Sequence, residues 1–225
     1  MKPVYFLDAG TTWSKILKVQ NDKKEYSIIK TSDIKNSDID FEIKTGHSVD
    51  KTKGKYENEV VAMSFGVDKQ KLQNETILDL GSRDAKWIKF KNSKFQDMDW
   101  NTNCASATGA TIEMLLKFYN LDINELKATK EKYPVTCGIF GLEKIMDDVS
   151  NGVDTSFAVS KFISGIAYNA YNFTKRPDRI YLSGGFCENK CFVDSLNFYT
   201  KVIPLGRFVL VDGLYNIYKN NMNNC

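Results

Sequence analysis

The chain has 225 residues, of which 42% are hydrophobic and 26% charged, and its formal net charge is only +3. This composition is typical of an ordinary globular protein with one good core or two small lobes. The small net charge and the scattered lysines argue against a dedicated nucleic-acid binder or membrane-surface binder. Asp8 follows the N-terminus too closely for a signal peptide, and no apolar run reaches membrane-spanning length, so a cytoplasmic location is expected.

Cysteine and histidine usage narrows the chemistry further. The five cysteines are Cys104, Cys137, Cys187, Cys191 and Cys225. An odd number of cysteines in a reducing compartment does not predict disulfides. The single histidine, His47, argues against Ser-His-Asp catalysis and against His-rich metal sites.

The first informative feature in chain order is an internal repeat. Residues 7–18 align with residues 78–89, and a Leu, an Asp, a Gly and two Lys recur at one constant offset. Each copy predicts an apolar strand that ends in Asp, a turn that contains Gly, and a second strand, followed by a polar turn and a third strand. The third strands are expected at residues 26–30 and 95–96. A fixed-offset repeat of about seventy residues indicates two related lobes rather than a solenoid.

The two D-x-G turns offer phosphate binding. A Gly turn between strands can point successive backbone N–H groups at an anion. A carboxylate at the strand end, such as Asp8 or Asp79, can hold hydrated Mg²⁺ against the phosphates. Two such turns facing each other would clamp the phosphates and the metal of one nucleotide. A single D-x-G is common at hairpins, and it is the matched pair that favours phosphate binding.

Residues 31–57 carry the weakest pattern. They are expected to form loops around one short strand at residues 41–44, and His47 lies in such a loop. Residues 59–66 then predict a short helix that ends at Gly66.

A cysteine precedes a predicted helix at two places. Cys104 lies among small residues before apolar residues at helical spacing, and we expect it at or just before the start of that helix. Cys137 follows Pro134 in the same arrangement. Free N–H groups and the positive end of the helix dipole favour thiolate over thiol, so two such cysteines can share an anionic ligand. A lone intracellular cysteine is more often a small buried hydrophobe, and these residues alone leave that alternative open.

The remaining elements are expected to be helices and short strands. A short helical piece is expected at residues 123–127, and the longest helix at residues 155–174, whose apolar stripe is core packing. A buried strand at residues 179–182 leads into Ser183, Gly184 and Gly185, and a helix follows near Glu188 and Asn189. A strand, a Gly-Gly pair and a helix let a base or ribose lie against bare backbone. The chain is expected to close with a strand at residues 207–211 and a helix from residue 212.

Cys187 and Cys191 form a C-x₃-C pair directly after the Gly-Gly pair. No His and no further Cys lies nearby in sequence to complete four metal ligands. We therefore predict that both cysteines are structural or incidental.

Five motifs, in order, resemble those of one known family. Residues 8–15 (DAGTTWSK) resemble D-I-G-S-T-T-T-K, and residues 79–86 (DLGSRDAK) resemble D-I-G-G-Q-D-S-K. Residues 103–109 (NCASATG) are similar to K-C-A-A-G-T-G, residues 136–140 (TCGIF) to T-C-x-V-F, and residues 183–189 (SGGFCEN) to T-G-G-V-A-x-N. The family is the activator ATPases of 2-hydroxyacyl-CoA dehydratases, related to ATPase subunits of benzoyl-CoA reductase. The resemblance covers nearly the whole chain.

The resemblance implies an α/β, actin/Hsp70/sugar-kinase-like ATPase fold with two related lobes around a nucleotide cleft. Residues 1–73 would form lobe I, on which a C-terminal helix at residues 212–225 packs back, and residues 74–211 would form lobe II. It also implies a homodimer with one [4Fe–4S] cluster on its two-fold axis. Two cysteines per chain, Cys104 and Cys137, cannot complete Cys₄ ligation, whereas a two-fold dimer supplies four. Such proteins use ATP to pass one electron, received from ferredoxin or flavodoxin, to a dehydratase-like or reductase-like partner.

At the matched positions the resemblance implies the following site. Asp8, Asp79 and Lys15 are the expected catalytic residues, and the two aspartates would bind Mg²⁺ through water. The expected residues for ATP or ADP are Gly10, Thr11, Thr12, Gly81, Ser82, Lys86, Thr108, Gly109, Gly184, Gly185 and Asn189.

The sequence also departs from the family pattern. Arg83 replaces a Gln and Ala107 replaces a Gly. These two changes weaken the expectation of ATP turnover more than that of nucleotide binding. Leu142 and Lys144 stand where the family carries acids, which indicates a different partner surface. Two alternatives therefore remain: a non-catalytic nucleotide-binding accessory dimer of the same fold, and a small-molecule kinase. A kinase has no need of the paired cysteines.

Overall fold

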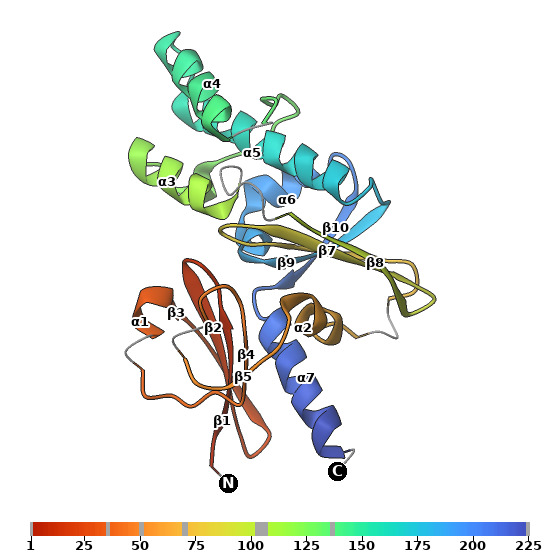
Figure 1. Cartoon of the computed structure of the whole chain (residues 1–225). Coiled ribbons are helices and arrows are strands. Elements are labelled where there is room, and N and C mark those ends of the chain that lie inside the picture. The colour runs from red at the N-terminus through yellow and green to blue at the C-terminus, as the bar shows by residue number, and fades with distance from the viewer. Residues whose placement is uncertain are drawn as a thin grey trace. The chain divides into compact units, whose positions relative to one another are not determined.

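The computed structural model describes residues 2–34, 37–49, 52–68, 72–101, 108–135 and 138–223. Contacts within the chain divide it into two compact units (Figure 1). Unit 1 comprises Met1–Gln73, Phe90–Phe95 and Arg207–Cys225, and unit 2 comprises Asn74–Lys89 and Gln96–Gly206. Each unit holds a five-stranded sheet, so both are mixed α/β structures.

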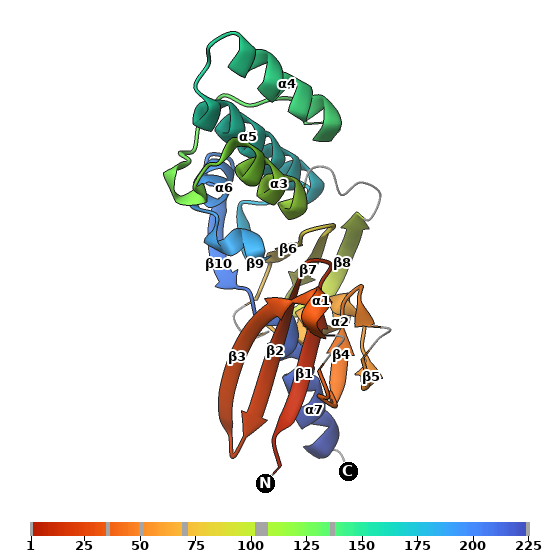
Figure 2. The ribbon, with the colours of Figure 1, turned by 90° about the vertical axis from the view of Figure 1, so that its left-hand side faces the viewer.

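The sheet of unit 1 has the strand order β3-β2-β1-β4-β5. Its strands are β1 (Val4–Ala9), β2 (Trp13–Gln20), β3 (Lys23–Lys30), β4 (Ile43–Thr45) and β5 (Lys55–Tyr56), and its helices are α1 (Thr31–Ile34), α2 (Glu59–Phe65) and α7 (Val209–Asn223). β1 to β3 form an antiparallel meander, to which β4 and β5 add in parallel. Figure 2 shows this sheet with α7 against one face, where Phe6 contacts the rings of Tyr215 and Tyr218.

The sheet of unit 2 has the order β10-β9-β6-β7-β8. Its strands are β6 (Thr76–Leu80), β7 (Ala85–Lys91), β8 (Lys94–Asn101), β9 (Arg179–Gly184) and β10 (Lys201–Gly206), its α-helices are α3 (Gly109–Tyr119), α4 (Gly138–Ser150), α5 (Thr155–Phe173) and α6 (Lys190–Leu196), and its 3₁₀ helices are η4 (Ile123–Glu125) and η5 (Gly185–Glu188). β6 pairs antiparallel with β7 and parallel with β9. Leu78, Trp87, Phe162 and Phe192 belong to one core, which joins one face of this sheet to α5 and α6.

Helix α5 forms where the sequence predicts it. Asp154 caps its N-terminus by accepting a hydrogen bond from the Phe157 amide at 2.9 Å. Its apolar residues are buried along most of its length, as expected for a helix inside a core. Among the described residues, no helix is long and apolar enough to cross a membrane.

The internal repeat extends to the backbone of the two hairpins. Asn21 and Asp22 join β2 to β3 with φ of 49° and 61°, and Asn92 and Ser93 join β7 to β8 with φ of 50° and 58°. Two successive residues with positive φ are typical of the type I′ turns that match the twist of antiparallel strands. Both predicted polar turns are therefore tight two-residue turns, and they fix the register of the strands that they join.

Several predicted boundaries were wrong. The strand expected at residues 207–211 is β10, Lys201–Gly206, and α7 begins at Val209 rather than at residue 212. Val209, Leu210 and Val211 are buried residues of α7, and a short apolar run does not distinguish a strand from a buried helix. Pro204 obscured β10, although proline is tolerated on an edge strand. The sequence also failed to indicate α1 and β5, each of four residues or fewer.

Helices α2 and α7 approach each other closely at two glycines. A Cβ atom on Gly213 would lie 1.8 Å from the carbonyl oxygen of Ala62, and one on Gly66 would lie 2.0 Å from that of Val209. Asn216 Nδ2 also donates to the Phe65 carbonyl oxygen at 2.8 Å. The contact depends on bare backbone, because any side chain at these positions would separate the helices.

We predict that Gly213→Ala lowers the free energy of unfolding by about 3 kcal/mol, because backbone atoms must move to admit the methyl group. Urea titration followed by circular dichroism measures the change. Asn220→Ala is the matched control, since it introduces alanine at an exposed position of the same helix. Equal midpoints for the two variants would show that the helices do not pack this closely.

Candidate functional site

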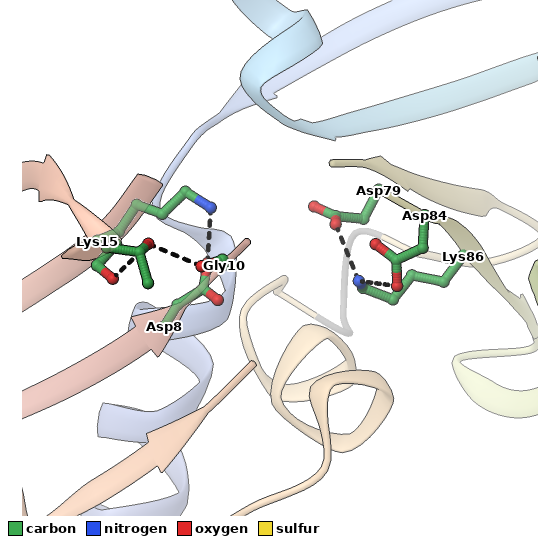
Figure 3. A network of polar contacts seen from close by, with 8 residues as sticks. Asp8, Gly10, Lys15, Asp79, Asp84 and Lys86 are labelled. Carbon is green, nitrogen blue, oxygen red and sulfur yellow. Dashed lines mark hydrogen bonds and ion pairs between the residues drawn. The ribbon is translucent and has the colours of Figure 1, made fainter. Parts of the chain in front are cut away.

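The first D-x-G turn, in unit 1, is built on a buried ion pair. Asp8 lies at the end of β1, where only 4% of its surface is exposed, and Lys15 is its cross-strand partner on β2. Lys15 Nζ lies 2.8 Å from Asp8 Oδ2 (Figure 3). The attraction offsets the cost of burying both charges.

Two segments that the sequence did not indicate support this turn. Thr31 Oγ1 donates to the Gly10 carbonyl oxygen at 2.7 Å, and its amide donates to the Thr12 carbonyl oxygen at 3.0 Å. The Ser48 amide donates to the Ala9 carbonyl oxygen at 3.0 Å. The backbone of the turn is thus hydrogen-bonded from the start of α1 and from the loop after β4. Of the two predicted threonines, Thr11 is exposed and Thr12 is half-buried.

A buried lysine organises the loop after β4. Lys44 Nζ donates to the carbonyl oxygen of Val49 at 3.0 Å and also to that of Thr52. The lysine is 9% exposed, so its charge is stabilised by backbone dipoles in a site of low polarity. Nothing in the sequence separates Lys44 from the many exposed lysines, which explains why it was missed.

The second D-x-G turn, in unit 2, repeats the pair and adds a second carboxylate. Asp79 ends β6 and faces Lys86 on β7 in register. Lys86 Nζ lies 3.5 Å from Asp79 Oδ2 and 3.4 Å from Asp84 Oδ2 (Figure 3). Trp100 Nε1 donates to the same Asp84 oxygen at 2.5 Å. Lys86 is 2% exposed and is therefore enclosed by this network.

The two turns consequently differ in charge. In unit 1 the residue at the position of Asp84 is Trp13, by the constant offset of the repeat. Asp84 also accepts a backbone hydrogen bond from the Gly81 amide at 3.0 Å, which closes the turn. The second motif contains Asp84, whereas the first motif has Trp13 at the equivalent position. This difference in sequence was the available signal that the two turns are not equivalent.

Helix α3 is fastened to the second turn. Thr108 Oγ1 donates to the Ser82 carbonyl oxygen at 2.5 Å, the Gly109 amide to that of Gly81 at 3.2 Å, and the Ala110 amide to that of Ser82 at 3.1 Å. The first amides of α3 are thus used by the turn rather than left for an anion. The predicted helix start at Cys104 was wrong, because α3 begins at Gly109. Cys104 itself lies outside the described residues.

Helix α4 begins at Gly138, the residue after Cys137, and Cys137 also lies outside the described residues. A three-residue cluster fixes its other end. Tyr133 Oη donates to Asp148 Oδ2 at 2.6 Å, and Lys161 Nζ on α5 donates to the same oxygen. These bonds join α4, α5 and the segment that leads to Cys137.

The Gly-Gly segment lies directly beside Asp79. Gly184 ends β9 with φ of 90°, and a Cβ atom there would lie 3.1 Å from Asp79 Oδ1. Gly185 begins η5. Asn189 is 6% exposed, and its side chain caps α6 by accepting from the Phe192 amide at 3.0 Å. In this structure, therefore, Gly184 contacts the second turn and Asn189 serves the helix.

Cys187 and Cys191 are free thiols in packed surroundings. Cys187 Sγ donates to the Leu182 carbonyl oxygen at 2.9 Å, and burial raises the pKa of this thiol to about 11. Cys191 is 1% exposed within the core, and burial likewise raises its pKa. Metal ligation needs thiolates, so these surroundings favour the predicted structural role.

The helices that follow Cys104 and Cys137 carry exposed apolar side chains. They are Met114 and Phe118 on α3, and Ile139, Phe140 and Met146 on α4, each more than half exposed. Large apolar side chains that gather on a surface mark an interaction site more often than isolated ones do.

Comparison with known proteins identifies distant relatives, although no protein-family model matches the chain. The chain is 20% identical over 197 residues to the (R)-2-hydroxyglutaryl-CoA dehydratase activating ATPase of Acidaminococcus fermentans, which covers 80% of the chain and 76% of that protein. The structure of the activator of the 2-hydroxyisocaproyl-CoA dehydratase from Clostridium difficile with bound ADPNP has a TM-score of 0.80 at 18% identity and covers 99% of this chain and 97% of that one. Component A of the (R)-2-hydroxyglutaryl-CoA dehydratase of A. fermentans has a TM-score of 0.79 at 17% identity, with coverage of 99% and 100%. The predicted actin/Hsp70/sugar-kinase type of fold is confirmed.

The Asp148 cluster predicts an acid-sensitive contribution to stability. The hydrogen bond from Lys161, and next that from Tyr133, hold the pKa of Asp148 below its usual range. A lowered folded-state pKa stabilises the protein above the unfolded pKa of about 4, and this stabilisation is lost as the pH falls through the folded value.

We therefore predict that Asp148→Asn is less stable than the wild type at about pH 7 and that the difference shrinks below about pH 4. Urea midpoints across this pH range measure it. Asp147→Asn, an exposed neighbour on the same helix, is the control and should follow the wild type. A constant difference between Asp148→Asn and the wild type at all pH values would contradict the assignment.

Proposed function

We propose, from its distant homology to the activator ATPases of 2-hydroxyacyl-CoA dehydratases and the fold that it shares with them, that this chain hydrolyses Mg·ATP to drive electron transfer. The observation that carries the proposal is the repeated D-x-G turn with a buried Asp–Lys pair at each strand end. A related activator was solved with ADPNP bound, which supports nucleotide binding.

The donor atoms of the two turns fit Mg²⁺. Carboxylate oxygens suit this ion, which keeps several of its waters when protein side chains bind it. Asp8 and Asp79 would hold it through water, and Asp79 would also orient the attacking water. The bound ion would supply charge that stabilises the developing transition state.

The two lysines are proposed to differ in role. Lys86 lies between Asp79 and Asp84, so its charge is compensated twice within the second turn. Lys15 pairs with Asp8, and 17% of its side chain is exposed, compared with 2% for Lys86. We therefore assign the phosphate contact to Lys15 and a positioning role to Lys86, alongside the predicted backbone contacts at Gly10 and Gly81.

We further propose that Cys104 and Cys137 ligate a [4Fe–4S] cluster shared across a homodimer. Iron–sulfur clusters of this type need four thiolates, which two copies of the chain supply. The exposed apolar side chains on α3 and α4 support the dimer, because they lie on the helices that directly follow the two cysteines. We propose a cytoplasmic location by analogy with the related activators.

The partner surface is proposed to differ from that of other activators. Lys144 is exposed on α4, whereas Leu142 is partly buried and packs against the core. Of these two departures from the family pattern, Lys144 therefore alters the charge that a partner meets. We propose that the electron comes from a ferredoxin or flavodoxin and passes to a dehydratase-like or reductase-like enzyme. Units 1 and 2 are proposed to act as the two ATPase lobes.

One observation favours a second function, that of a nucleotide-binding regulator without turnover. Arg83 replaces the family Gln and its side chain is exposed in the second turn. Phosphate release assayed with and without a reductant distinguishes the two functions, since a regulator binds ATP but releases no phosphate under either condition.

We predict that Asp8→Asn and Asp79→Asn each lower ATP hydrolysis by at least about 10²-fold, the scale of losing one electrostatic contact to the transition state. Phosphate release by the anaerobically purified protein measures it. Asp38→Asn is the control, because it removes an exposed carboxylate of unit 1. Wild-type turnover in either site variant would contradict the assignment.

We also predict that Cys104→Ser or Cys137→Ser abolishes bound iron and visible absorption, because each change removes two of four ligands from a shared cluster. Iron and sulfide assays on freshly purified anaerobic protein, with its visible spectrum, measure the effect. The double change of Cys187 and Cys191 to Ser is the control and should leave both unchanged. Iron that follows the second pair instead would refute the proposed ligand set.

A further inference from the structure

Ser183 carries a buried hydroxyl near the end of β9. It is the last residue of β9 before the glycine at its end, and none of its surface is exposed. Within the part of the chain that the structure describes, its Oγ atom has no hydrogen-bond partner. Leaving a buried hydroxyl unpaired is unfavourable, and most such groups bind an ordered water or a ligand.

The sheet register places Ser183 beside the second turn. β9 pairs in parallel with β6, and Ser183 lies directly opposite Asp79. Asp79 in turn lies opposite Lys86 on β7. Directly paired residues of neighbouring strands project from the same face of a sheet. Lys86, Asp79 and Ser183 therefore form one polar row across three strands.

The two oxygens of Asp79 face different neighbours within this row. Oδ2 lies 3.5 Å from Lys86 Nζ, on the side of β7. Oδ1 lies 3.1 Å from the position of a Cβ atom on Gly184, on the side of β9. The oxygen that is not paired with Lys86 is thus the one next to the strand that carries Ser183.

The neighbour of Ser183 on its other side is a glycine. On β10 its partner is Gly206, which has no side chain that could bond the hydroxyl. Of the two residues paired with Ser183, only Asp79 therefore carries a polar side chain.

We propose that Ser183 Oγ and Asp79 Oδ1 together bind the water molecule that attacks the γ-phosphate. This inference rests on the ATPase function proposed above. Two acceptors that take both protons of one water leave its lone pairs directed away from them, which orients the attack. The water oxygen forms a bond to phosphorus, the bond from phosphorus to the ADP oxygen breaks, and one water proton passes to Asp79 and then to solvent.

The test compares Ser183→Ala with Ser183→Thr in the anaerobically purified full chain. Ser183→Ala is expected to lower kcat about tenfold, equivalent to about 1.4 kcal/mol, while the Kd for Mg·ADP stays within about twofold. Ser183→Thr keeps the hydroxyl and is expected to restore most of kcat. Without nucleotide, Ser183→Ala should melt at the wild-type temperature or above, because it removes an unpaired buried group.

Ser195→Ala is the control for the loss of a buried serine. Ser195 Oγ on α6 lies 2.9 Å from Ser164 Oγ on α5, so its loss should lower the melting temperature and leave kcat unchanged. A kcat for Ser183→Ala within about twofold of the wild type overturns the proposal, as does an equal loss in Ser183→Thr. A wild type that binds no Mg·ADP removes the proposed function, and this inference falls with it.

Discussion

The structure depends on a charge pair that spans each of two hairpins. Asp8 and Lys15, and likewise Asp79 and Lys86, are cross-strand partners at the ends of their strands. A buried carboxylate or ammonium group without its partner would destabilise the fold, because the partner offsets the cost of losing hydration. The pairing is possible only in one register, since a slip of one residue would turn one partner to the other face. The two-residue turns between β2 and β3 and between β7 and β8 fix the register of the next strand pair in each sheet.

Duplication of this hairpin did not produce two equal turns. The first turn accepts hydrogen bonds from Thr31 and from the loop that Lys44 organises, both within unit 1. The second gains Asp84, with Trp100 bonded to it, and is hydrogen-bonded to the start of α3. Both turns can bind a ligand. A movement of the second turn would in addition displace the start of α3, to which it is hydrogen-bonded. The different roles proposed for Lys15 and Lys86 follow from this difference between the turns.

The sequence predicted what repeats and what is periodic. The constant offset located both D-x-G turns, and the helical spacing located α5 almost to its ends. It could not predict Lys44 or Trp100, because their partners are carbonyl and carboxylate oxygens brought near only by folding. It misassigned residues 207–211 because a short apolar run fits either a strand or a buried helix. Ser183 belongs to one of the motifs, but only the packed sheet reveals that its hydroxyl has no partner among the described residues.

The second turn is connected differently to α3 and to α4. Residues 108–110, at the start of α3, donate three hydrogen bonds to the carbonyl oxygens of residues 81–82. α4 is bonded instead to α5 and to the segment before Cys137, through Asp148. A displacement of the Gly81 and Ser82 carbonyls must therefore move the start of α3 or break bonds there, whereas the bonds of Asp148 connect α4 to α5 and to Tyr133. Because cores resist gradual deformation, we expect α3 to follow a displacement of the turn more closely than α4 does.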